Sequence, residues 1–463
     1  MTSSSRRSRS LVLGSLVALV VGACGPTASP GGSAGPGSSA EPTPVTGASC
    51  ASGATEVKFW TSHTPPDSDS LAKIVEAFNA ANTDICVKMT IVPGGETDIA
   101  KLLTAIRGGV APDVYMADRF TVPQRAEEGA LDALPASSEA KKSEHVEFAW
   151  NETQYKGKTY ALPFDTDARA LWYNKDLITA AGEDPAQLDI SKGAPTIELV
   201  TRIADKINKL DASGNYEVMG WMPGGPGDSG PGAFDQGWHY TWGFVHGGSF
   251  AEGCDVTPTN AGVVAGFQFL YDWQKAHDPQ KVARWVTTNW PPQSPQQSFP
   301  FWTGKLGMTI SGDWQIANSK KYAPNTNYGF TFIPVPKEGD ETATWAGGWS
   351  MALIPNSKAK DQAVKFIEYA PGPDGQRVYT KETTHLPTLI ALQQDASLFD
   401  EQHKIFLDLL PDAKNRPPLA VGGIYWDALT AAQGSVELNS KTPQEALEEV
   451  ETTVQPRLDE VGC

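Results

Sequence analysis

Alternating strand and helix patterns in residues 55–116 constrain the fold of this chain more than any other feature. Residues 55–61 are β-branched and aromatic, which is typical of a strand. Apolar residues then recur on one helical face, at Leu71, Ile74, Val75 and Phe78. Two further strand patterns, at 85–92 and 114–116, enclose a second helical pattern that stops at Gly108-Gly109. This β-α-β-α-β order predicts a parallel sheet covered by helices, with ligands bound at the carboxyl ends of the strands.

The same patterns recur downstream, so we expect a second α/β unit. Strands are predicted at 170–173, 307–310 and 350–354. Two helix faces are formed by Val263, Phe267, Leu270 and Tyr271 and by Leu447, Val450 and Val454. With 463 residues, of which 40% are hydrophobic and 20% charged, the chain is long enough for more than one buried core.

The beginning of the chain has the pattern of an export signal. Arg6, Arg7 and Arg9 precede an apolar stretch, 11–23, that is too short to cross a bilayer as a helix. The stretch ends in Val21-Gly-Ala-Cys24, and small residues before a cysteine resemble the cleavage motif of bacterial lipoproteins. We therefore expect a signal peptide at 1–23 and a lipidated Cys24. An ordinary signal peptide with an incidental cysteine is the alternative.

A low-complexity segment separates Cys24 from the first strand pattern. Gly, Pro, Ser, Ala and Thr supply 27 of the 30 residues in 25–54. Such a composition cannot bury enough apolar surface to offset the entropy lost on folding. Residues 24–54 are thus predicted to be a lipidated Cys and a disordered tether, which anchors a folded body outside the cytoplasmic membrane.

Charge and cysteine content exclude several classes of protein. The net charge is -17, whereas a nucleic-acid binder normally needs a basic surface. Beyond Cys24 the cysteines are Cys50, Cys86, Cys254 and Cys463, and none has the C-x-x-C spacing of a zinc or redox site. In an exported protein we expect disulfides, for which three connectivities are open; free buried thiols are the alternative.

Several short motifs occur along the sequence in an order that is typical of a known protein family. They are Val57-Lys-Phe-Trp60, Ala111-Pro-Asp-Val114, Met116-Ala-Asp-Arg-Phe120, Tyr160-Ala-Leu-Pro-Phe-Asp165, Leu171-Trp-Tyr-Asn-Lys175, Gly304-Lys-Leu-Gly-Met308, Ser311-Gly-Asp-Trp314, Gly347-Gly-Trp349, His385-Leu-Pro-Thr388 and Tyr425-Trp426. In this order, behind a lipoprotein motif, they resemble the family 1 extracellular solute-binding proteins of ABC importers, which include the maltose- and maltodextrin-binding proteins. The resemblance covers nearly all of residues 55–463.

The resemblance implies an α/β, two-lobed periplasmic-binding-protein fold of type II. Its parallel-sheet lobes would be joined by hinge crossings near Asp165, Thr344 and Glu382. The implied N-lobe comprises 55–165 and 344–381, and the implied C-lobe comprises 166–343 and 382–463. The two lobes of such a protein close on their ligand like a clamp.

The resemblance also implies partners and disulfides. On the lobe division above, Cys50 would pair with Cys86 and Cys254 with Cys463, because other pairings would staple the lobes together and oppose closure. The chain would be a monomeric receptor without cofactor or metal, anchored to the cell membrane by its lipid. It would deliver a carbohydrate, such as a di- or oligosaccharide, to the permease subunits of an ABC transporter.

Residues suited to a sugar lie at several of the expected strand ends. A saccharide needs flat aromatic surfaces for its apolar faces and polar side chains for its hydroxyls. The candidate ligand residues are Trp60, Ser62, His63, Asp118, Arg119, Asp165, Asp167, Trp238, Trp314, Gly348, Trp349, Tyr425 and Trp426. In the resembling family, residues comparable to Asp118, Arg119 and Asp167 contact the ligand.

Two other classes of function are weighed against this interpretation. A secreted glycoside hydrolase could use Asp165 and Asp167, but glycosidases hold their carboxyl groups roughly 5–9 Å apart across the substrate, and these two are close neighbours in the chain. A receptor of the same fold for glycerol-phosphate or another small solute is disfavoured for anions, because unpaired Asp beside a buried phosphate is costly. We expect no catalytic residue.

Overall fold

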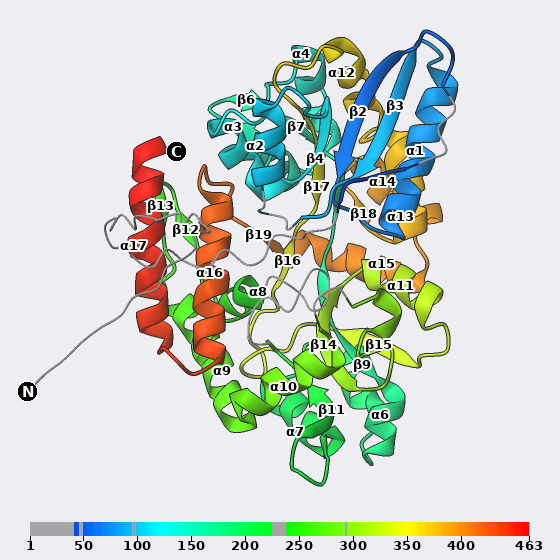
Figure 1. Cartoon of the computed structure of the whole chain (residues 1–463). Coiled ribbons are helices and arrows are strands. Elements are labelled where there is room, and N and C mark those ends of the chain that lie inside the picture. Colours follow the sequence, from blue (N-terminus) through cyan, green and yellow to red (C-terminus); the bar gives the residue numbers. More distant parts are fainter. Residues whose placement is uncertain are drawn as a thin grey trace, which may run out of the picture. The chain divides into compact units, whose positions relative to one another are not determined.

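The two sheets of the protein are built largely from the predicted strands. The computed structural model describes residues 41–45, 50–94, 97, 99–224, 238–291 and 294–462. All of these residues belong to one unit, Ser38–Cys463. Within this unit, Figure 1 shows one sheet above the other, with short strands running between them. These sheets define the two lobes.

The upper sheet contains the β-α-β-α-β segment. In spatial order its strands are β1 (Thr43–Pro44), β3 (Ile85–Ile91), β2 (Thr55–Thr61), β4 (Val114–Asp118), β17 (Trp349–Leu353) and β7 (Ala161–Pro163). As predicted, β2 runs parallel to β3 and β4. The helices of this lobe include α1 (Asp67–Ala81), α2 (Ala100–Arg107), α3 (Val122–Glu127), α12 (Lys360–Tyr369) and α13 (Pro373–Thr383).

The apolar face predicted in residues 71–78 is confirmed. Leu71, Ile74, Val75 and Phe78 are each no more than 2% exposed. They belong to the same buried cluster as Val57 and Phe59 of β2. Burying a side chain of this size contributes roughly 1.5–3 kcal/mol, so this face fixes α1 on the sheet.

The lower sheet has the order β10 (Lys209–Leu210), β11 (Tyr216–Trp221), β14 (Leu306–Gly312), β9 (Arg169–Asn174) and β15 (Tyr328–Thr331). Its helices include α6 (Lys175–Ala180), α7 (Ile197–Ile207), α8 (Trp238–Val245), α9 (Ala261–His277), α10 (Pro279–Asn289), α11 (Trp314–Tyr322), α15 (Glu401–Leu409), α16 (Gly422–Glu437) and α17 (Pro443–Val461). The predicted faces of α9 and α17 are buried, except that Tyr271 is only partly covered.

Both sheets are mixed, which corrects the expectation of parallel-sheet lobes. β9 runs antiparallel to β14 and β15, and β17 runs antiparallel to β4 and β7. The reason lies in how the chain enters each sheet. β9 and β17 follow directly from a strand that crosses between the lobes, without the crossover helix that a parallel connection requires.

Two pairs of short strands connect the lobes. β8 (Asp165–Thr166) pairs with β18 (Leu386–Pro387), and β16 (Thr344–Ala346) pairs with β19 (Ala413–Asn415). β16, β18 and β19 lie between the two sheets in Figure 1.

The chain joins the upper sheet before residue 55. Thr43 pairs with Ile91 and Pro44 with Thr90, so part of the predicted tether is held along the edge of β3. The predicted Cys50–Cys86 disulfide is confirmed, with Cα atoms 5.5 Å apart. Cys254 is also disulfide-bonded. Its expected partner Cys463, Cys24 and the signal peptide lie outside the described residues, and so does most of the tether.

Candidate functional site

Arg119, the residue after β4, fastens the crossing strands to the upper lobe. It is fully buried, and its Nε donates a hydrogen bond to Glu152 Oε2 at 2.8 Å. Its two terminal nitrogens donate to the backbone carbonyl oxygens of Asp165 and Gly347. Gly348 permits this approach, because its φ is +127° and a Cβ there would lie 2.1 Å from Arg119 Nη1. Arg119 therefore holds hinge backbone.

Asp118 and Trp426 are brought together by Arg416, a residue that the sequence did not single out. Arg416 donates to the two carboxylate oxygens of Asp118 at 3.0 and 2.6 Å. Its guanidinium lies 4.0 Å from the centre of the Phe120 ring, and the Phe120 and Trp426 rings are 5.2 Å apart. Trp426 is 7% exposed. This cluster connects the end of β4 to the start of α16.

Asp167 is the anionic half of a second buried pair. It accepts hydrogen bonds from the backbone N–H of Gly347, at 2.7 Å, and from Arg169. Burial alone would raise the pKa of Asp167, but the charge of Arg169 and the Gly347 hydrogen bond hold that pKa below its usual value. The Arg169 guanidinium lies 5.2 Å from the centre of the Trp314 ring.

Four further polar side chains meet where both lobes and a pair of crossing strands converge. Asp165 is on β8, Asp313 precedes α11, Tyr379 is on α13 and His385 precedes β18. His385 Nδ1 lies 3.6 Å from Asp165 Oδ2 and 4.0 Å from Asp313 Oδ1. Asp165, Asp313, Tyr379 and His385 are 1%, 0%, 1% and 7% exposed. We call these four residues the interlobe cluster.

Each member of the interlobe cluster has a buried polar atom without a hydrogen-bond partner. These atoms are Asp165 Oδ2, Asp313 Oδ2, Tyr379 OH and His385 Nδ1. The other carboxylate oxygens are satisfied, since the backbone N–H of Trp349 donates to Asp165 at 2.6 Å and that of Trp314 to Asp313 at 2.9 Å. Buried polar atoms in proteins are nearly always paired, so a bound ligand or water at this cluster would supply the missing partners.

Aromatic rings border the interlobe cluster. The His385 ring stacks between Trp314, at 5.7 Å, and Tyr379, at 5.4 Å. The ring of His63 meets the ring of Trp349 edge-on at 4.4 Å. Trp314 and Trp349 are only partly buried. Flat apolar surfaces thus lie beside unsatisfied polar atoms, which is the combination that a saccharide needs.

Burial shifts the pKa values of the titratable groups here toward their neutral forms. It raises the pKa of Asp165 and of Asp313 well above the usual range, and the negative charge of Asp167 raises both further. It lowers the pKa of His63 to about 3 and that of His385 to about 4. Burial therefore favours the protonated forms of the two carboxyl groups, and a protonated carboxyl group can donate as well as accept hydrogen bonds.

The remaining predicted residues are spread over both lobes. Trp60 and Ser62 are partly buried at the end of β2, and His63 is buried with Nδ1 3.0 Å from Thr61 Oγ1. Trp238 is buried at the start of α8, and Tyr425 is buried with its OH donating to Phe250 O at 2.8 Å.

Sequence reasoning assigned no role to Asp313, Tyr379 and His385. Asp313 and His385 stand inside quoted motifs, and their position beside a strand was the available signal. Tyr379 gave none, because it lies within a helix.

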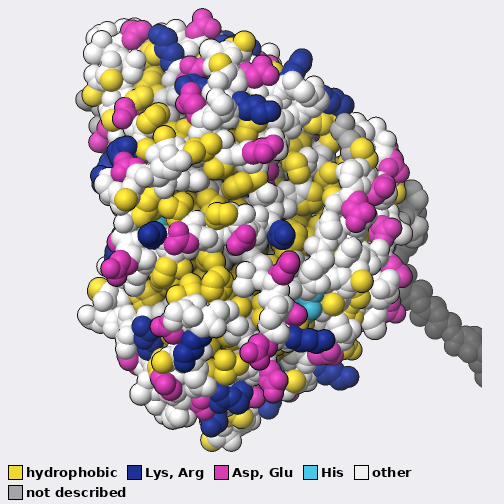
Figure 2. Space-filling model, turned by 180° about the vertical axis from the view of Figure 1, so that it is seen from behind, with side chains coloured by type: hydrophobic (Ala, Val, Ile, Leu, Met, Phe, Trp, Pro, Cys, Tyr) yellow, Lys and Arg dark blue, Asp and Glu magenta, His cyan; other side chains and the backbone are white. Residues whose placement is uncertain are grey.

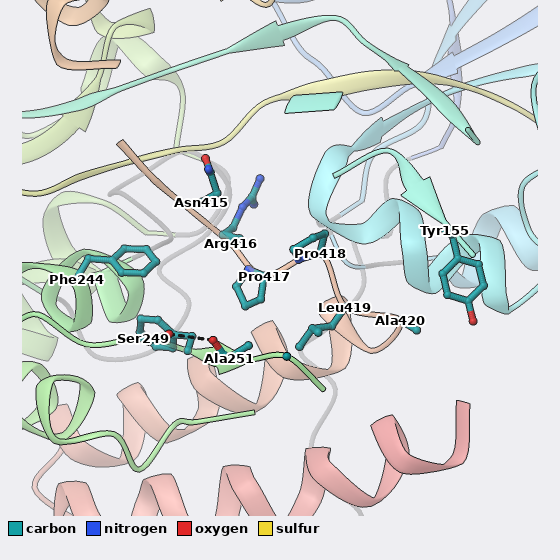
Figure 3. Close-up of a pocket in the computed structure, with 12 residues that line it drawn as sticks. Tyr155, Phe244, Ser249, Ala251, Asn415, Arg416, Pro417, Pro418, Leu419 and Ala420 are labelled. Atoms are coloured by element: carbon teal, nitrogen blue, oxygen red, sulfur yellow. Dashed lines mark hydrogen bonds between the residues drawn. The ribbon is translucent and has the colours of Figure 1, made fainter. Parts of the chain in front are cut away.

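Two mainly apolar hollows flank the 413–420 segment. One, of about 440 Å³, lies between Tyr155 and Phe244, and Figure 3 shows residues 415–420 running across it. The other, of about 620 Å³, is bordered by Phe148, Glu152 and Leu407 among others. Neither lining includes a member of the interlobe cluster.

On the face in Figure 2, acidic and basic side chains are interspersed, and hydrophobic side chains gather in the hollow across its middle. Within the described ranges, no group of three or more His, Cys, Asp or Glu could hold a metal ion. No helix among the described residues has the length and apolar character needed to cross a bilayer.

Two lobes, joined by crossing strands and sharing a buried cluster of unsatisfied polar atoms, define a ligand-binding protein of the two-lobed receptor class. A family model described as bacterial extracellular solute-binding protein matches residues 73–403. The chain belongs to this family of solute-binding proteins.

Individual relatives are distant but cover most of the chain. The chain is 24% identical to the maltooligosaccharide ABC transporter solute-binding lipoprotein of Streptococcus pneumoniae (strain ATCC BAA-255 / R6), over 73% of each chain. It is 23% identical to the sn-glycerol-3-phosphate-binding periplasmic protein UgpB of Escherichia coli (strain K12), over 73% of this chain and 75% of that one. The solved structure of CpMnBP1 with mannotriose bound superposes with a TM-score of 0.75 and 23% identity, covering 86% of this chain and 100% of that chain.

Proposed function

We propose that this protein is the receptor of an ABC importer and binds a carbohydrate between its two lobes. It catalyses no reaction and passes the sugar to permease subunits in the cytoplasmic membrane. A lipid on Cys24 anchors it to the outer side of that membrane, and it acts as a monomer. Family membership supports the receptor role, and two of the similar proteins named above are described by the saccharides they transport or bind.

The interlobe cluster carries the sugar assignment. Its four unpaired polar atoms come from the upper lobe, the lower lobe and the crossing strands. Sugar hydroxyls both donate and accept, so they can pair with carboxyl, phenol and imidazole groups alike. Closure on a sugar would bring all of these groups to it at once, which couples binding to the closed form.

The geometry favours sugar over the alternatives. As a glycosidase pair, Asp165 and Asp167 are poorly placed, because Asp167 is engaged by Arg169 and by the Gly347 N–H. Among the described residues, no lysine or arginine side chain lies within ion-pair distance of Asp165 or Asp313, so a phosphate at this cluster would lack a compensating cation. This disfavours an anionic ligand, even though one relative is named for glycerol-3-phosphate.

Calorimetry of the purified protein with a panel of mono-, di- and oligosaccharides tests the proposal. We expect saturable binding in the micromolar range, as for about 23 ligand atoms at roughly 0.3 kcal/mol each. The radius of gyration in small-angle scattering should fall when the sugar saturates the protein. Chromatography of the sugar after long incubation should show no product. Cleavage of a glycoside would make the protein an enzyme, and binding without compaction would refute the clamp.

The anchor is tested separately in cells. Wild-type protein should fractionate with membranes and carry a lipid on Cys24 by mass spectrometry. The Cys24→Ser variant should lose the lipid and the membrane association. A variant that remains on the membrane to the same extent would contradict the proposed anchor.

A further inference from the structure

The interlobe cluster is a meeting point of carboxyl groups. Asp165 and Asp313 approach the same imidazole from the crossing strand and from the lower lobe. Asp67, at the start of α1, is near enough to raise the pKa of Asp165 further by its charge. Among the described residues, His385 is the one basic side chain within ion-pair distance of Asp165 or Asp313. Its imidazole is neutral at pH 7, since burial lowers its pKa to about 4.

The nearby arginines form hydrogen bonds and ion pairs with other groups. Arg119 donates to Glu152 and to two backbone carbonyls, and Arg169 pairs with Asp167. Among the described residues, the titratable and charged groups that act electrostatically on the cluster are His63 after β2, Asp67 from α1, Asp167 and Arg169 beside β8, Arg119 from η1 (Arg119–Thr121) and His403 from α15. Within the described part of the chain, the carboxyl groups of Asp67, Asp165, Asp167 and Asp313 outnumber the two arginines, Arg119 and Arg169, that act on Asp165 and Asp313.

We propose that the saccharide bound here carries an amino group, and that its ammonium lies between the carboxyl groups of Asp165 and Asp313. This inference rests on the proposed function. An ammonium offers three N–H donors and accepts nothing. His385 Nδ1 lies 3.6 Å from Asp165 Oδ2 and 4.0 Å from Asp313 Oδ1, and Asp165 Oδ2, Asp313 Oδ2 and His385 Nδ1 are buried atoms that can accept and that lack a partner. A hydroxyl offers one donor to the same set.

The positive charge of an amino sugar also favours its binding beside these carboxyl groups. An ionised carboxylate in a buried site needs a compensating cation, and one ammonium supplies the charge for one of the two carboxyl groups through charge-assisted hydrogen bonds. Burial keeps the pKa values of both Asp residues high while no cation is present. The ammonium stabilises their ionised forms, so each carboxyl that ionises on binding gives its proton to the buffer. A neutral sugar leaves those protons in place.

Matched ligands test the inference. Gluco-, galacto- and manno-configured mono- and disaccharides are titrated calorimetrically in three forms each, with hydroxyl, N-acetylamino or free amino at C2. Each titration is repeated at pH 7 in two buffers of different ionisation enthalpy, which counts protons released. The amino form of the preferred sugar should bind roughly tenfold or more tightly than its hydroxyl form and release about one proton or more. The N-acetyl form, which has no charge, should behave like the hydroxyl form.

Substitutions test whether the preference for the amino sugar depends on Asp165 and Asp313. In Asp165→Asn and Asp313→Asn the ratio of amino to hydroxyl affinity should fall toward one, and proton release should shrink. Asp374→Asn, an exposed position on α13, makes the same charge change outside the cluster and should keep the wild-type ratio. Thermal melts check that each variant is folded, and the ratio within one variant cancels any general loss of affinity.

The outcomes separate the two proposals. Equal affinity for amino and hydroxyl forms, or weaker binding of the amino form, overturns this inference and leaves the carbohydrate receptor intact. A preference that persists in both Asn variants, with wild-type proton release, also overturns it. If no saccharide in any form binds, the proposed function fails and this inference fails with it.

Discussion

Asp118 and Arg416 are 298 residues apart in the sequence and form a two-point ion pair, with nitrogen–oxygen distances of 3.0 and 2.6 Å. Their side chains are 5% and 2% exposed. One residue ends a strand of the upper lobe, and the other follows a crossing strand. The pair therefore ties the hinge to the upper sheet.

Asp118→Ala should lower the free energy of unfolding by about 3–5 kcal/mol, because it removes the carboxylate that forms a two-point pair with the buried Arg416 guanidinium. Urea denaturation followed by tryptophan fluorescence measures this. Asp132→Ala is the matched control, since Asp132 pairs with Lys360 at 2.7 Å on the surface. The control should cost no more than about 1 kcal/mol. A stable Asp118→Ala protein that had lost sugar affinity would instead assign Asp118 to the ligand.

The stability of the protein should depend on pH through Asp67. Burial raises the pKa of Asp67 from 3.8 to about 7. Between these values the folded protein holds a proton that the unfolded chain has released, so the free energy of unfolding falls as pH rises through this window. Asp67→Asn should remove that part of the dependence. Urea titrations of both proteins at several pH values between about 4 and 8 measure it, and parallel curves would contradict the assignment.

Trp314→Ala should weaken sugar binding by about 1 kcal/mol, roughly fivefold in Kd, through loss of a flat apolar face beside the interlobe cluster. Trp314→Phe keeps an aromatic face and should lose less. Calorimetry with the best sugar measures both, and circular dichroism checks the fold. Unchanged affinity in a folded Trp314→Ala protein would place the sugar elsewhere.

Removing the Cys50–Cys86 disulfide should destabilise the protein by about 3–4 kcal/mol, as expected for a loop closed across 36 residues. The Cys50→Ala, Cys86→Ala double variant is compared with the wild type by thermal denaturation. Sugar affinity at a temperature where both are folded should be unchanged, since the bridge joins the strand starts. A double variant as stable as the wild type would show that the bridge does not limit unfolding.

The parts of the fold that depend on local sequence patterns were predicted correctly. The strand of residues 55–61 and the buried face of α1 depend on composition and spacing within a few residues, and both are confirmed. The direction of β9 and β17 was wrong, because direction depends on whether a helix or a crossing strand precedes the strand. The pattern of residues within a strand does not show which element precedes it, and so does not predict its direction.

The candidate site was harder to predict, because its groups are defined by partners that are distant in sequence. Asp118 was found at a strand end, yet its partner Arg416 lies in a Pro-rich segment without a pattern of its own. His385 and Asp313 come within 4.0 Å only after the lobes are joined. Tyr379 occupies a helix position that fits core packing equally well. What sequence reasoning supplied was the set of strand ends at which to look.

The pairing of β1 with β3 and the Cys50–Cys86 bridge also decide where mechanical load enters the protein. On the anchor proposed above, any pull between body and membrane is transmitted through the residues before Thr43. Two paired residues resist such a pull weakly, so β1 would peel away first. The force would then reach Cys50 and pass through the covalent bridge into the start of β3. The disulfide thus limits how far the chain can be pulled out, and the upper lobe stays folded while the tether is under tension.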